Sequence, residues 1–151
     1  MKKLPFETKQ TLSNEADFYL SKVRNLDKEI IGFCKNTRRE SSILVAYNLS
    51  GIYSCFEDIF EKIAKVFENN IENKAAWHSE LLLRMHIPIK GIRPAVISDD
   101  SFKLLDELRA FRHVFRQSYV FSLEADRINL LVKKWNKGKR SLMSEITDFL
   151  K

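Results

Sequence analysis

Hydrophobic residues recur at three- and four-residue steps along most of the chain, which places them on one face of an α-helix. The segment from Ser41 or Ser42 to about Asn70 is the most apolar, so we expect it at the centre of the core. No segment alternates with the two-residue period of a β-strand. The spacing predicts helices over 7–39, from Ser41 or Ser42 to about Asn70, over 74–85, from the caps at 98–101 through Tyr119, and from Glu124 or Ala125 to the C-terminus. The predicted fold class is all-α: an up-and-down bundle of four main helices plus a short one, in a single domain over 1–151.

Proline and glycine positions refine this prediction. Residues 87–98 contain two prolines and one glycine, which excludes a helix, yet the segment is too apolar for a solvated linker. We therefore expect an ordered loop laid over the bundle. Gly51 lies inside the second helix, where glycine is costly, and so indicates a close helix contact. Gly138 is expected to weaken the last helix.

The composition of the chain indicates which kinds of partner it binds and in which cellular compartment it is expected. The 151 residues carry a net charge of +6, with 44% hydrophobic and 30% charged residues, as in ordinary globular proteins. The positive charge favours anionic partners, with nucleic acid first and an acidic protein second. No run approaches the roughly 18 apolar residues of a membrane span, so a cytoplasmic location is expected. Cys34 and Cys55 lack metal-ligand spacing and are expected to be buried thiols, and we expect neither a metal site nor a cofactor.

The fourth predicted helix has two contrasting faces. Its apolar side is expected to pack against the bundle and comprises Leu104, Leu108, Phe111, Val114, Phe115 and Phe121. Its other side is expected to form a basic strip of Arg109, Arg112, His113, Arg116, Gln117 and Tyr119. From Arg109 to Tyr119 this strip contains no carboxylate, whereas a purely structural helix usually mixes both signs of charge. An anionic partner is therefore predicted for it.

The stretch Arg112-His113-Val114-Phe115-Arg116-Gln117-Ser118-Tyr119 resembles the Arg-x4-His-x-Tyr signature of HepT-like toxins of the HEPN superfamily. Ala76-Trp77-His78 and the loop over 91–97 resemble the same family. The resemblance implies a HEPN-like helical bundle that cleaves RNA without metal at a homodimer cleft. It also implies a nucleotidyltransferase antitoxin that neutralises the protein.

Within this resemblance, Arg112 corresponds to the motif arginine and Tyr119 to the tyrosine that the antitoxin can modify. Gln117 stands where the motif has histidine, and an amide cannot exchange a proton near neutral pH as histidine does. His113 lies one helical turn earlier and is the candidate acid or base, so Arg112 and His113 are the predicted catalytic pair. Arg109, Arg116 and Gln117 are the predicted RNA phosphate ligands.

Other interpretations remain open at this stage. The chain can instead be a non-catalytic HEPN-fold module that binds RNA, a nucleotide or a nucleotidyltransferase through the same face. A regulatory protein unrelated to HEPN that binds acidic ligands is a third possibility. His78 and His86 are predicted to be structural, Trp77 and Trp135 to lie in the core, and the cations of 133–140 to form a solvated surface or an extension of an RNA footprint.

Overall fold

Five helices form the described part of the chain in the computed structural model, which describes residues 2–35, 39–68, 77–117 and 124–151. They are α1 (Phe6–Cys34), α2 (Arg39–Glu68), α3 (Trp77–His86), α4 (Asp99–Gln117) and α5 (Ala125–Leu150). Within these ranges there is no strand, and the only β-type pairing is an isolated bridge between Ile89 and Arg93. The all-α prediction and the order of the helices are therefore confirmed.

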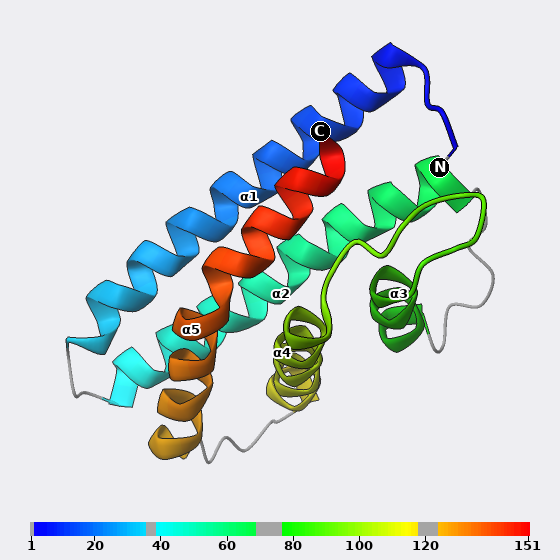
Figure 1. The fold of residues 1–151 in the computed structure, drawn as a ribbon. Coiled ribbons are helices and arrows are strands. Elements are labelled where there is room, and N and C mark those ends of the chain that lie inside the picture. Colours follow the sequence, from blue (N-terminus) through cyan, green and yellow to red (C-terminus); the bar gives the residue numbers. More distant parts are fainter. Residues whose placement is uncertain (1, 36–38, 69–76, 118–123) are drawn as a thin grey trace.

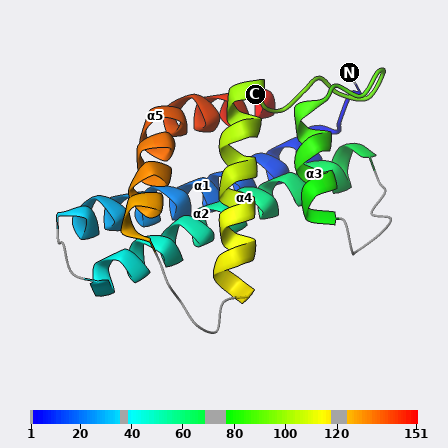
Figure 2. The same cartoon turned by 90° about the horizontal axis from the view of Figure 1, so that it is seen from below.

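Helix α2 is the centre of the bundle, as its apolar sequence predicts. It contacts each of the other four helices, which no other described helix does. Figure 1 shows α1 and α2 side by side and antiparallel. The C-terminal half of α5 lies along this pair, whereas its N-terminal half runs across it in Figure 2. Helices α3 and α4 are seen nearly end-on in Figure 1 and along their length in Figure 2, so they cross the α1–α2 pair steeply. This crossing carries the basic residues of α4 over the middle of α2.

Several local predictions need correction. Helix α1 ends at Cys34 rather than Arg39, and Cys34 is exposed because it lies in the last turn of that helix. Ser41 is buried inside the first turn of α2 instead of capping it. Gly138 lies within α5, and its weakening of that helix stays a prediction. A Cβ there would come within 2.7 Å of Leu104 Cδ2, so the glycine allows α4 and α5 to approach closely. Gly51 packs against Leu26 of α1, as expected.

The cations of 133–140 are partly neutralised by carboxylates from other helices. Lys134 Nζ lies 2.7 Å from Glu107 of α4, and Lys139 Nζ lies 2.8 Å from Asp27 of α1. Trp135 is fully buried, as predicted, and its indole N–H donates to the same Asp27 carboxylate at 2.8 Å. These contacts give much of this cluster a structural role in joining α5 to the bundle.

The loop between α3 and α4 is ordered, as its proline and glycine content predicts. Gly91 has a φ of 76°, which lets the chain reverse between Ile89 and Arg93. The Arg93 guanidinium then turns inward, with its side chain 0% exposed. It donates through Nε to Glu68 of α2 at 2.9 Å and also to the carbonyl oxygens of Arg84, Ile87 and Pro94. One buried arginine thus ties the loop, α3 and α2 together.

The start of α4 is held by Ser98 and Glu145. Ser98 Oγ accepts the backbone N–H of Ser101 at 3.3 Å, a helix cap at the position that the sequence predicts. The Ser98 hydroxyl and backbone N–H both donate to the Glu145 carboxylate of α5, at 2.7 and 3.0 Å. Burial alone would raise the pKa of Glu145, but the hydrogen bonds from Ser98 and its neighbours lower it below its ordinary value.

No helix in the described ranges is both long enough and apolar enough to cross a lipid bilayer.

Replacing Arg93 with Met should lower the free energy of unfolding by about 3 kcal/mol, because it removes one of the two arginine partners of a Glu68 carboxylate that is only 3% exposed and leaves only Arg84 of α3. Urea denaturation followed by circular dichroism measures this loss. In the double variant Arg93→Met/Glu68→Met part of the stability should return, since the buried carboxylate is removed as well and the Arg84 guanidinium that loses it is 26% exposed. A loss below about 1 kcal/mol in the single variant would contradict this account.

Replacing Glu145 with Gln should lower stability at neutral pH by weakening the cap of α4. Because the folded protein lowers the pKa of Glu145, its contribution is complete above the ordinary value of 4.5 and is lost as the pH falls below it. The difference in melting temperature between the wild type and Glu145→Gln should therefore shrink under acid. Asp17→Asn, at an exposed position of α1, is the control and should show no such convergence. A difference independent of pH would rule out the carboxylate as its source.

Candidate functional site

Arg112 of α4 is a buried arginine, not an exposed member of the basic strip. Arg112 is 7% exposed. Leu108 follows Leu105 by three residues and Arg112 follows Leu105 by seven, so all three lie on the buried side of α4. Val114, predicted on the packed side, is instead 51% exposed, because it follows Leu108 by six residues and so points to another side of α4. The predicted positions of Arg112 on the exposed strip and of Val114 on the packed side are therefore both wrong.

The Arg112 guanidinium fits a polar recess on α2. Its Nη1 donates to Ser54 Oγ at 2.9 Å, and its Nη2 donates to the Glu57 carboxylate at 3.2 and 3.3 Å. Its Cζ lies 4.8 Å from the centre of the Tyr53 ring, a cation–π contact. Glu57 follows Tyr53 by four residues and Ser54 by three, so the three side chains lie on the same side of α2. Burial raises the pKa of Tyr53, and the Glu57 charge raises it further, so its hydroxyl stays protonated.

Glu57 also binds a residue of α3. Oε2 of Glu57 lies 2.7 Å from Nδ1 of His78, while the Glu57 side chain is only 14% exposed. His78 itself is half exposed, and the structural role predicted for it stays a prediction. His86, eight residues later, does pack as a structural residue: its ring stacks on Phe102 with the centroids 4.8 Å apart. One carboxylate of α2 therefore joins α3 and α4.

A cavity of about 430 Å³ lies beside this junction, and we call it the arginine cavity. It is lined by His78, Ser79, Arg109, Arg112, His113, Arg116 and Gln117. All five predicted catalytic and phosphate-binding residues of α4 thus meet in one place, although burial separates Arg112 from the rest. Tyr119, the predicted modification site, lies outside the described residues, as does Phe121 of the predicted apolar face.

The charges of the arginine cavity are only partly available to a ligand. Arg112 is paired with Glu57, and Arg109 Nε donates to Asp106 of its own helix at 2.9 Å. Arg116 and His113 are exposed and form no ion pair with any described residue. An anion entering the cavity would therefore meet Arg116 first.

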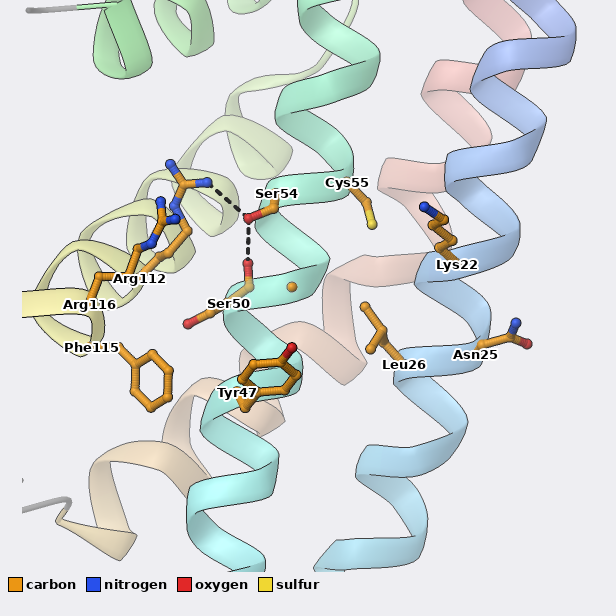
Figure 3. A pocket seen from close by; sticks show the side chains of 11 residues that line it. Lys22, Asn25, Leu26, Tyr47, Ser50, Ser54, Cys55, Arg112, Phe115 and Arg116 are labelled. Carbon is orange, nitrogen blue, oxygen red and sulfur yellow. Dashed lines mark hydrogen bonds between the residues drawn. The ribbon is translucent and has the colours of Figure 1, made fainter.

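A second hollow, of about 500 Å³, lies on the other side of Arg112, and we call it the Tyr47 pocket. Figure 3 shows it between α1, which contributes Lys22, α2, which contributes Tyr47, and α4, which contributes Phe115 and Arg116. Its lining is mainly apolar, with cations at its edge. Arg112 and Arg116 line both hollows, so the two are neighbours along α4.

Sequence reasoning missed Glu57 and His78. His78 was tested only for metal-ligand spacing, which it lacks. The signal for Glu57 was available, because it is a carboxylate between Phe56 and Phe60 on the most apolar helix, and such a group needs a buried partner. Its partners come from two other helices, so spacing alone does not identify them. Across the described residues, no group of three or more His, Cys, Asp or Glu side chains is placed to hold a metal ion.

A family model described as HepT-like protein matches residues 44–151, which is well over half of the chain and includes α3, the loop and α4. Neither the curated proteins nor the solved structures include a significant match.

Proposed function

Because the chain belongs to the HepT-like proteins of the HEPN superfamily, we propose that it is a toxin-like endoribonuclease that cleaves RNA without metal. The observation that carries this proposal is the arginine cavity. It places an exposed arginine and two histidines around one space, beside a buried arginine at the signature position. Arginines bind the phosphate and stabilise charge on its oxygens, while a histidine can move protons near neutral pH.

The family also supports a nucleotidyltransferase antitoxin as the protein partner, with Tyr119 as the residue that it modifies. The proposed active unit is a homodimer in which the arginine cavities of two chains form one cleft. In this proposal the two chains meet through the exposed side of α4, where Val114 lies next to His113.

A non-catalytic module that binds RNA or a nucleotide is the second candidate, and two observations favour it. Gln117 cannot perform the proton transfer of the motif histidine. The Tyr47 pocket also offers two aromatic rings next to Lys22 and Arg116, a combination that suits a stacked base with its phosphate.

Incubating the purified protein with a mixed RNA pool in EDTA separates these two functions. The endoribonuclease should cleave the pool, and His113→Ala should slow cleavage by about 10²- to 10⁴-fold if His113 exchanges a proton. RNA binding without cleavage by the wild type would instead establish the binding module. Neither binding nor cleavage would leave only a protein-binding role for this face.

Arg116→Ala should weaken RNA binding and reduce the slope of log affinity against log salt concentration by about 0.7 to 1, because one phosphate contact is lost. Fluorescence anisotropy with a labelled single strand measures both changes. Arg24→Ala is the matched control, since it removes one exposed arginine from α1 outside either hollow. Equal effects of the two variants would show that net charge alone, and not the arginine cavity, binds RNA.

At micromolar concentration the protein should sediment with twice its chain mass of 17.8 kDa. Val114→Glu should shift it towards the monomer, because a charge on the proposed contact must be desolvated. Ile31→Glu, at an exposed apolar position of α1, serves as the control and should leave the dimer intact. A wild-type monomer would contradict the shared cleft.

A further inference from the structure

The contact between Glu57 and His78 has the form of a carboxylate that orients a histidine for proton transfer. Glu57 Oε2 and His78 Nδ1 are 2.7 Å apart, a distance typical of a charge-assisted hydrogen bond. An ionised carboxylate only accepts hydrogen bonds, so Nδ1 carries the proton in this pair. In the neutral ring Nε2 is then the unprotonated atom, and it is the atom that can accept a proton from a ligand.

Glu57 is held firmly in the position that this role requires. Its carboxylate accepts both Nη2 contacts of Arg112, and Arg112 is in turn held by Ser54 and the Tyr53 ring. The pairing with this arginine limits the orientation of the carboxylate. It can therefore stabilise an imidazolium on His78 once the ring accepts a proton.

The location of His78 is as informative as its partner. The ring is half exposed and lines the arginine cavity together with His113, Arg116 and Gln117. A histidine that only joined α3 to α2 would not need to face this cavity. The position that lacks a proton-transfer group, Gln117, thus lies in the same cavity as a histidine supplied by another helix.

We propose that His78, oriented by Glu57, is the general base of RNA cleavage in the arginine cavity; this rests on the endoribonuclease function proposed above. Nε2 of His78 takes the proton of a ribose 2′-hydroxyl while that oxygen forms a bond to the adjacent phosphorus. The bond from phosphorus to the 5′-oxygen breaks, and His113 donates a proton to this leaving oxygen. The products are a 2′,3′-cyclic phosphate and a 5′-hydroxyl, with no metal, water or redox partner consumed.

The roles of the arginines divide accordingly. Arg116, which is exposed, binds the phosphate that is attacked, and Arg109 lies in the same cavity as a second ligand. Arg112 is a positioning residue, because its guanidinium is committed to Ser54 and Glu57. It acts on the reaction through the carboxylate that it holds.

The test compares His78→Asn and His78→Ala with His86→Asn in the EDTA cleavage assay. Asparagine keeps a hydrogen-bond donor near Glu57 but cannot accept the proton, so kcat should fall by about 10²- to 10⁴-fold. His86→Asn, in the same helix but stacked on Phe102, should cleave as the wild type does. Binding of an uncleavable 2′-deoxy strand and the melting temperature should be close to wild type in His78→Asn.

Added imidazole gives a readout that a structural role would not produce. Because His78 is half exposed, imidazole can enter the space left by His78→Ala and should restore part of the cleavage rate. Cleavage by His78→Asn at the wild-type rate would overturn this inference and leave the endoribonuclease function intact. Loss of cleavage that imidazole does not restore, together with loss of binding to the 2′-deoxy strand, would assign His78 a structural role and also overturn it. A wild type that does not cleave RNA would overturn the proposed function and this inference together.

Discussion

Two carboxylates on one helix control how the smaller helices are placed. Glu57 and Glu68 are eleven residues apart on α2, close to three full turns, so they face the same side about 16 Å from each other. Glu68 is buried against Arg93 and holds the loop and α3, while Glu57 binds Arg112 and His78. Because a buried carboxylate without its partner is costly, separating α3 or α4 from α2 would carry a free-energy penalty.

This arrangement separates the arginines of α4 into two kinds. Arg112 is buried against α2, and its charge is balanced before any ligand arrives. Arg116 and His113 are exposed on the same helix and line the arginine cavity. The signature position of the HepT-like family is therefore a structural junction in this chain, while the residues around it line the arginine cavity. The proposed chemistry therefore depends on the position of His78 on α3 as much as on the residues of α4.

Two histidines from different helices line the arginine cavity, His78 from α3 and His113 from α4. On α4 the place of the motif histidine is taken by Gln117, which can donate and accept hydrogen bonds but does not titrate. His78 reaches the same cavity from α3 and has the carboxylate partner that a proton-transfer histidine needs. The two positions are almost forty residues apart in the sequence, and the steep crossing of α3 and α4 over α2 brings them to one space.

The sequence by itself determined the helices, their order and the central place of α2, because burial of an apolar face with a 3.6-residue period is a local property. It also identified the arginine and histidine residues of α4 and the ordered loop with Gly91. Only the tertiary structure decided that Arg112 is buried, that Val114 is exposed, and that Glu57 and His78 belong to the site. The spacing of a residue along the chain determines which face of its helix it occupies. The polar partner of a buried charge comes from another helix, so it depends on how the helices cross in the folded protein.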